Sequence, residues 1–336
     1  MKNFALIFTL ACMFVAPLFA ESQDIEPFLG RWALFLPGGA GWLDVKTDDG
    51  FVDADLLWYG GSVTPVMDAY LDGETLVVTR LSRKVMKKDA DGKALRVHQR
   101  TELYKFMLYG DQMVGEQISP AANGFGVKTT KFTGKKIPDL PPAPDLAKLK
   151  YDKPIALFDG TDLSNWELMG ENSVNGWSVA DGAMSNNPVQ EEGKPHKHYG
   201  NIRTKAEFED FNLKLQVNVP KGSNSGIYLR GIYEVQVFDS YGKPLDSHNM
   251  GAIYSRITPT VSAEKPAGEW QDLDITLADR HVTVVLNGKT IIDNQPLLGC
   301  TGGAITACEF IPGPIYLQGD HGKVSYRNIV LTPIVK

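Results

Sequence analysis

A carboxyl, an amide and a guanidinium group lie close together in residues 224–242, NSGIYLRGIYEVQVFDSYG, a stretch otherwise typical of two β-strands. Side chains alternate between the two faces of a strand, so Glu234 and Gln236 share one face and lie about 7 Å apart. By the same alternation, Tyr228 and Arg230 share one face of the preceding strand. A carboxyl group can transfer a proton, and amide and guanidinium groups can hold ligand oxygens. The structural alternative is a surface ion pair, which the solvated face of an antiparallel sheet often carries.

A second group of reactive side chains lies in residues 316–322, YLQGDHG. Gln318 ends a short apolar strand, and Asp320 and His321 then occupy a turn between two glycines. A neighbouring carboxylate and imidazole can act as general acid, general base or metal ligand near neutral pH. Alternatively, the aspartate caps the turn and the histidine orders it.

The loop after the Glu234 strand adds polar residues at the same strand end. Asp239 and Tyr241 begin this loop, and Lys265 and Glu269 follow in the segment AEKPAGEW. We expect all four at the rim of a substrate pocket, although Asp239 reaches it only if the loop bends back. Lys265 and Glu269 fit an exposed turn equally well.

Asp246 and His248 form a weak candidate cation site. A carboxylate and an imidazole two residues apart can bind a divalent metal, but no third ligand stands at a fixed spacing from them. A divalent metal therefore stays an open alternative, and the sequence indicates no other cofactor.

The first 20 residues, MKNFALIFTLACMFVAPLFA, have the features of a secretory signal peptide. The apolar run is short and ends abruptly, so we expect a secreted or periplasmic protein rather than an integral membrane protein. The formal net charge of −6 argues against nucleic acid as a partner, because phosphate binding needs basic patches.

Two cysteines, Cys300 and Cys308, remain once a signal peptide is removed. An oxidising compartment would favour a disulfide closing their glycine-rich loop, CTGGAITAC. The alternative is a reactive or metal-binding pair of thiols, for which no further ligand stands at a suitable spacing.

The elements that must position these groups are β-strands throughout. In residues 155–336, segments such as FNLKLQVNV, WQDLDITLA and HVTVVLNGKTII are bounded by Gly, Asp, Asn or Pro. Antiparallel strands at this spacing indicate a two-sheet sandwich or jelly roll with apolar inner faces.

A proline-rich linker, residues 135–154, separates this domain from an N-terminal domain over residues 21–134. Pairs such as Asp49–Gly50 divide the N-terminal domain into short strands, which predicts a small antiparallel β-barrel or meander. Its GRW tripeptide resembles the start of lipocalin-type barrels. The segments PGGAGW and LLWYGGSV fit either the mouth of a ligand site or ordinary turns and packing.

The segment IALFDGTDLSNWEL, residues 155–168, resembles the start of the DUF1080 family, the 3-keto-disaccharide hydrolase domain. The resemblance continues in the family's order through FEDFNLKLQVNV, GSNSGIYLRGIYEVQVFDSYG, PAGEWQDLDITL, VVLNGK and GPIYLQGDHGKVSYRNI. It spans the C-terminal domain and leaves the N-terminal domain outside. The chain has LQGDHG where family members more often have LQDHG, so whether Asp320 or His321 faces the pocket stays open.

This resemblance implies a concanavalin-like jelly roll and action on glycosides already oxidised at C3, by hydrolysis or by elimination. A ketone at C3 acidifies the C2 hydrogen, so the reaction needs a base, a donor for the enolate oxygen and an acid at the leaving group. The residues we expect to be catalytic are Glu234, Asp320 and His321. The residues we expect to bind the oligosaccharide or glycoside are Tyr228, Arg230, Gln236, Asp239, Tyr241, Lys265, Glu269 and Gln318.

A non-catalytic carbohydrate-binding jelly roll is the alternative function, because this fold hosts both enzymes and binders. Acids and bases outnumber exposed aromatic residues around the candidate site, and this composition favours catalysis.

Overall fold

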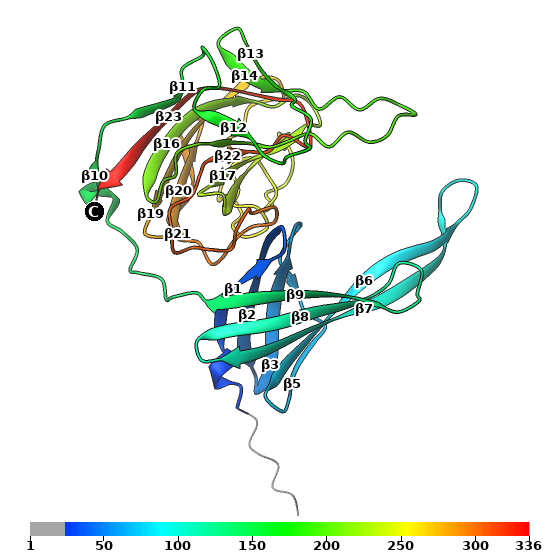
Figure 1. Cartoon of the computed structure of the whole chain (residues 1–336). Helices are drawn as coiled ribbons and strands as arrows, with labels where there is room; N and C mark the ends of the chain where they lie inside the picture. The colour runs from blue at the N-terminus through cyan, green and yellow to red at the C-terminus, as the bar shows by residue number, and fades with distance from the viewer. Residues whose placement is uncertain (1–23, 336) are drawn as a thin grey trace, which may run out of the picture.

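A computed structural model describes residues 24–335, so the expected signal peptide lies outside the described residues. Two β domains are joined by an extended segment (Figure 1), which confirms the all-β expectation. Within 24–335, the helical elements are two 3-10 turns, η1 (Glu26–Phe28) and η2 (Leu146–Lys148). None of the helices in this range has the length and apolar character needed to cross a membrane.

The N-terminal domain is a nine-stranded antiparallel meander with the strand order β4-β3-β2-β1-β9-β8-β7-β6-β5. Its strands are β1 (Gly30–Leu36), β2 (Gly39–Asp48), β3 (Phe51–Trp58), β4 (Thr64–Pro65), β5 (Asp68–Asp72), β6 (Thr75–Lys88), β7 (Ala94–Tyr109), β8 (Gln112–Pro120) and β9 (Val127–Lys136). The predicted turn at Asp49–Gly50 joins β2 to β3, and both residues have positive φ (48° and 84°). This is the backbone geometry of a two-residue hairpin that matches the strand twist.

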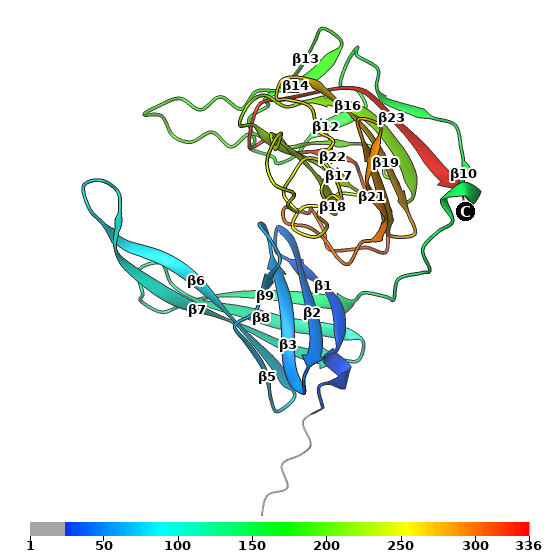
Figure 2. The ribbon, with the colours of Figure 1, turned by 180° about the vertical axis from the view of Figure 1, so that it is seen from behind.

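Aromatic residues fill the interior of this curved sheet. The Trp58 ring lies edge-on to Tyr104 and Phe132, with centroids 4.9 and 5.2 Å away. Trp32 and Phe106 are fully buried there. Beyond this core, β6 and β7 continue as a two-stranded arm (Figures 1 and 2).

The C-terminal domain is a jelly-roll sandwich of two antiparallel sheets, as expected. The larger has the order β13-β14-β23-β16-β19-β20-β21, with β10 and β11 also paired to β23, and the smaller the order β12-β15-β22-β17-β18. The larger sheet contains β10 (Lys150–Tyr151), β11 (Ile155–Phe158), β13 (Trp177–Ala180), β14 (Ala183–Asn186), β16 (Phe211–Asn218), β19 (Trp270–Ala278), β20 (His281–Leu286), β21 (Lys289–Pro296) and β23 (Val324–Val335). The smaller contains β12 (Trp166–Leu168), β15 (Ile202–Thr204), β17 (Asn224–Leu229), β18 (Tyr233–Phe238) and β22 (Tyr316–Leu317).

Strand alternation builds the core between these sheets. In β16, Phe211, Leu213, Leu215 and Val217 are buried, while the residues between them are not. The facing strands of the smaller sheet contribute Ile227, Leu229, Val235 and Val237 to the same apolar cluster. The opposite face of the smaller sheet is therefore free to carry polar residues.

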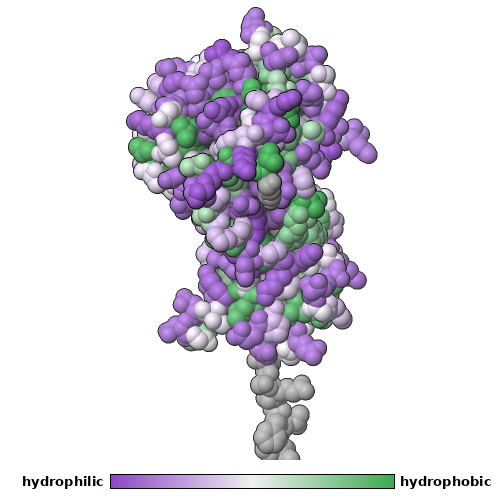
Figure 3. All heavy atoms as spheres, turned by 90° about the vertical axis from the view of Figure 1, so that its left-hand side faces the viewer, coloured by the Kyte–Doolittle hydropathy of each residue, from purple (hydrophilic) through white to green (hydrophobic). Residues whose placement is uncertain are grey.

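The segment between β9 and β10, residues 137–149, lies along the C-terminal domain. The Arg280 guanidinium donates to the carbonyl of Pro138 at 3.0 Å, and the Asn294 amide donates to that of Pro144 at 3.0 Å. Figure 3 shows the two domains as two lobes with a narrower waist between them.

Candidate functional site

One row of side chains crosses three strands on the polar face of the smaller sheet. Tyr228 of β17 pairs in register with Glu234 of β18 on one side and with Tyr316 of β22 on the other. Side chains directly opposite each other in a sheet lie on the same face, so the two tyrosines and the glutamate form a continuous row. From sequence, alternation predicts that Tyr316 shares a strand face with Gln318, and Glu234 with Gln236. The pairing of Tyr316 and Glu234 with Tyr228 is seen only in the structure.

The two tyrosine rings of this row are stacked, with centroids 3.8 Å apart. The Tyr228 hydroxyl oxygen lies 2.9 Å from Glu234 Oε2 and 2.7 Å from the carbonyl oxygen of Gly302. The Tyr316 hydroxyl donates to the carbonyl of Gly303 at 2.7 Å. The loop that contains both carbonyls therefore covers one side of the row.

Glu234 is held in this row by its backbone and by a neighbouring glycine. Its N–H donates to Thr301 Oγ1 at 2.9 Å, which satisfies a donor that has no strand partner at the edge of the sheet. A Cβ atom at Gly226 would lie 2.3 Å from Glu234 Oε1. The carboxyl group thus occupies space that only a glycine on β17 leaves open.

Glu234 is 4% exposed, and its burial raises the pKa of the carboxyl group to about 8, against the lowering effect of the Tyr228 hydrogen bond. A count of hydrogens agrees with a neutral carboxyl group. The Tyr228 hydroxyl has one hydrogen, and the Gly302 carbonyl can only accept. If that hydrogen goes to the carbonyl, the contact with Glu234 is favourable only when the carboxyl group donates. Near pH 7, Glu234 is accordingly an acid with a proton to give.

Asp320 and His321 stand at the end of β22 in the glycine-flanked turn. Gly319 fixes this turn, because its N–H donates to Asn201 Oδ1 and its carbonyl accepts from Asn186 Nδ2, both at 2.8 Å. The inserted glycine is thus held by hydrogen bonds at both backbone groups. His321 Nδ1 lies 2.7 Å from Asp320 Oδ1, and both side chains are about half exposed.

The hydrogen bond to Asp320 raises the pKa of His321 above its ordinary value. Desolvation raises the pKa of Asp320, but the hydrogen bond and charge of His321 outweigh it, so the net pKa lies below the ordinary value. Both charges act on Glu234, since His321 lowers and Asp320 raises the pKa of its carboxyl group. A buried neutral acid and a solvent-facing Asp–His pair therefore share one site, as in enzymes that use separate acid and base groups.

Two amides near the row have polar atoms without partners. Gln318 Oε1 and Asn224 Oδ1 are buried and make no hydrogen bond within the described protein. Asn224 shares the face of Tyr228 by alternation within β17. Gln318 follows β22 but continues its pairing with β17, because its N–H donates to the Gly226 carbonyl at 3.0 Å. Such acceptors suit the hydroxyl groups of a sugar. Gln236 is on this face too, but its Oε1 accepts from the N–H of Val237 at 3.0 Å.

Arg230, expected beside Tyr228, lies away from this row. The strand β17 ends at Leu229, and Arg230 adopts a left-handed turn conformation with φ 56°. Its guanidinium group is buried and donates to the carbonyls of Glu309, at 3.0 Å, and Ile311. The alternation rule fails here because it applies only while the strand continues.

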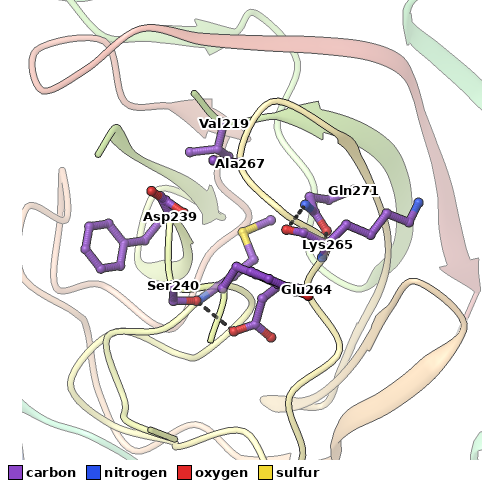
Figure 4. A pocket seen from close by; sticks show the side chains of 10 residues that line it. Val219, Asp239, Ser240, Glu264, Lys265, Ala267 and Gln271 are labelled. Atoms are coloured by element: carbon purple, nitrogen blue, oxygen red, sulfur yellow. Dashed lines mark hydrogen bonds between the residues drawn. The ribbon is translucent and has the colours of Figure 1, made fainter. Parts of the chain in front are cut away.

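Asp239, Tyr241 and Lys265 line a small cavity at the far end of β18, away from Glu234 (Figure 4). Its volume of about 10 Å³ suits one water molecule rather than a sugar ring. Asp239 Oδ2 accepts from the N–H of Gly222 at 2.8 Å, and Lys265 Nζ donates to the carbonyl of Trp270 at 2.9 Å. Glu269 is exposed in the adjoining turn. These four residues therefore stand apart from the row of Glu234.

Asp246 and His248 pair with each other, and His248 also contacts the N-terminal domain. His248 Nδ1 lies 2.5 Å from Asp246 Oδ1, and His248 Nε2 lies 3.0 Å from Ser62 Oγ. Across residues 24–335, no group of three or more His, Cys, Asp or Glu side chains is arranged to hold a metal ion.

The expected disulfide between Cys300 and Cys308 is not formed, and both cysteines are free thiols. Cys300 is buried with its Sγ 3.6 Å from the carbonyl oxygen of Gly41, in the N-terminal domain. The expectation rested on an oxidising compartment and on the spacing of the two cysteines. In fact the first cysteine packs against another domain, which sequence spacing does not show.

Comparisons with known proteins match the C-terminal domain. The family described as 3-keto-alpha-glucoside-1,2-lyase-like domain matches residues 153–332. A 3-keto-disaccharide hydrolase of Bacteroides thetaiotaomicron is 25% identical over 166 residues, a match that covers 41% of this chain and 57% of that protein. The chain thus spans little more than half of that relative's length.

A solved structure of a candidate glycosyl hydrolase from Parabacteroides distasonis is 33% identical, covering 58% of this chain and 91% of that one, with a TM-score of 0.44. A second from that organism is 26% identical, covering 54% and 98%, with a TM-score of 0.39.

Proposed function

The chain belongs to the family of 3-keto-alpha-glucoside-1,2-lyase-like domains, and from this premise we propose that it cleaves glycosides whose sugar carries a ketone at C3. Membership makes the chain a carbohydrate-active, glycosyl-hydrolase-like protein. One observation supports the specific reaction, namely the buried acid Glu234 in electrostatic interaction with the Asp320–His321 pair. A reaction that removes a proton at one carbon and protonates a leaving group at the next needs such a pair.

In this proposal His321 is the base. Its Nδ1 is held by Asp320, so Nε2 is the nitrogen available to take the C2 proton. The electron pair of the broken C2–H bond is delocalised onto the C3 carbonyl as an enolate. It then forms the C1–C2 double bond while the C1–O bond breaks. Addition of water across this double bond would give the same free 3-keto sugar that direct hydrolysis releases.

Glu234 is the acid for the departing oxygen. Its proton, retained near pH 7 because the carboxyl group is buried, passes to the glycosidic oxygen as the C1–O bond breaks. The stacked rings of Tyr228 and Tyr316 fix the carboxyl group beside the substrate face. Gln318 and Asn224 supply acceptors for ring hydroxyls.

We expect purified protein to release the aglycone from a 3-keto-glucoside and to leave the unoxidised glucoside intact, because only the ketone acidifies the C2 hydrogen. Glu234→Gln should lower the rate by about 10²- to 10⁴-fold, with a smaller loss for an acidic aglycone that leaves without protonation. The matched control is Glu167→Gln, on the same sheet, where the carboxylate only accepts from Arg203 at 2.7 Å in an exposed pair.

Equal binding of both glucosides without cleavage of either would instead support the non-catalytic carbohydrate-binding alternative. Equal rates for Glu234→Gln and the control would remove Glu234 from the mechanism. Export of the chain also stays part of this proposal, and the N-terminal sequence of the mature protein would test it.

A further inference from the structure

Residues 37–42 and 56–63, which from sequence fit either a ligand mouth or turns and packing, pack against the C-terminal domain. Trp42 and Leu57 are buried in the same apolar cluster as Cys300 and Ala304. The guanidinium carbon of Arg256 lies 4.2 Å above the Trp42 ring. This end of the N-terminal domain is therefore a docking surface within the chain.

The docking surface meets the loop that covers the Tyr228–Glu234 row. The N–H of Gly303 donates to the carbonyl of Tyr59 at 3.1 Å. A Cβ atom at Gly302 would lie 2.1 Å from the carbonyl oxygen of Gly61, so the two backbones touch. The loop has no room to move toward the N-terminal domain.

A single peptide group joins the two domains at this point. Its N–H belongs to Gly303 and donates to Tyr59, while its carbonyl belongs to Gly302 and accepts from Tyr228 at 2.7 Å. Hydrogen bonds at the two ends of one peptide polarise each other, so each strengthens the other. The position of the Tyr59 carbonyl thus influences how strongly the Gly302 carbonyl accepts the hydrogen of the Tyr228 hydroxyl.

Hydrogen bonds from residues 62 and 63 also hold the two domains together. Ser62 Oγ lies 3.0 Å from His248 Nε2, and the N–H of Val63 donates to Ser255 Oγ at 3.2 Å. With the Trp42–Arg256 stack, these contacts fix the carbonyl of Tyr59 relative to the sheet.

We infer that the N-terminal domain positions the proton donor of the C-terminal site, through the Tyr59 carbonyl, the 302–303 peptide and the Tyr228 hydroxyl. The inference rests on the proposed function for its catalytic meaning. The contacts themselves make Tyr59, Gly302 and Gly303 positioning residues, and they leave Glu234 as the group that meets substrate. The N-terminal domain then contributes to catalysis without a ligand of its own.

The test is a titration of the Glu234 carboxyl group by carbon NMR in the full-length protein, compared between variants. In Gly302→Ala the added methyl group must displace the 302–303 peptide from Gly61. Tyr228 is then free to donate to the carboxylate, which stabilises the charged form. The Glu234 pKa should fall by about one unit.

Gly60→Ala is the matched control, because a Cβ atom there would meet nothing within 4 Å and Gly60 does not have positive φ. Trp42→Ala loosens the docking without altering the 302–303 peptide itself, because the Trp42 ring packs against Gly299 and Arg256. It should shift the titration in the same direction. If Gly302→Ala does not fold, the Glu234 titration in Trp42→Ala alone tests the inference. A wild-type titration in whichever of these two variants is folded would overturn the inference. Because the titration needs no substrate, a shift without cleavage of any 3-keto-glycoside would contradict the proposed function and leave the positioning role supported.

Discussion

At the scale of single residues, the site depends on two groups whose protonation is set by different surroundings. Burial keeps the proton on Glu234, with a pKa of about 8, and the hydrogen bond to Asp320 raises the pKa of the half-exposed His321 above its ordinary value. Opposite environments for neighbouring titratable groups are how enzymes divide acid and base roles.

These pKa values predict a bell-shaped pH profile of kcat/KM. The base must be neutral, so the rate should rise as pH increases through the pKa of His321, above 6.5. The acid must be protonated, so the rate should fall as pH increases through about 8. Asp320→Asn should move the rising limb to lower pH, because the partner that raises the histidine pKa is lost. A rising limb unchanged in Asp320→Asn would contradict the assignment of His321 as base.

At the scale of elements, strand alternation predicts the face shared by Glu234 and Gln236, because both lie inside a regular strand. It misplaces Arg230, which follows the last residue of β17 and turns with positive φ. The loop of Gly302 could not be assigned to the site from sequence. It lies more than 60 residues from Glu234, and its role depends on tertiary packing.

Gly226 is the element-scale feature most open to test. Gly226→Ala places a methyl group 2.3 Å from the original position of Glu234 Oε1, so the carboxyl group must leave the row. We expect a cost of about 1–3 kcal/mol in unfolding free energy, typical of overpacking, and a rate loss comparable to Glu234→Gln. Chemical denaturation and kinetics of the full-length variant measure both.

The double variant Gly226→Ala/Glu234→Asp provides the control for that experiment. The shorter acid relieves the contact, so stability should return while the rate stays low. A single variant with wild-type rate would show that the position of Glu234 is not critical.

At the scale of the whole molecule, the sequence predicts two all-β domains but treats the open end of the first as a ligand mouth or as packing. In the structure this end is packed, because Trp42 and Leu57 lie in the same buried cluster as the jelly-roll core. Sequence could not choose between them, because both need apolar and glycine residues at strand ends. A shared core between domains makes their stabilities interdependent.

Trp42→Ala tests this interdependence. The substitution removes a buried ring that packs on Arg256 across the interface, so we expect a loss of about 3–5 kcal/mol in unfolding free energy. In calorimetry, the wild-type protein should unfold in one transition, and Trp42→Ala should lower the temperature of C-terminal unfolding although the substitution lies in the N-terminal domain. Phe51→Ser is the control, because Phe51 is 74% exposed in the β2–β3 hairpin and should change stability by less than about 0.5 kcal/mol. If Trp42→Ala left C-terminal unfolding unchanged, the two domains would be energetically independent, and the N-terminal domain could not hold the 302–303 peptide in place.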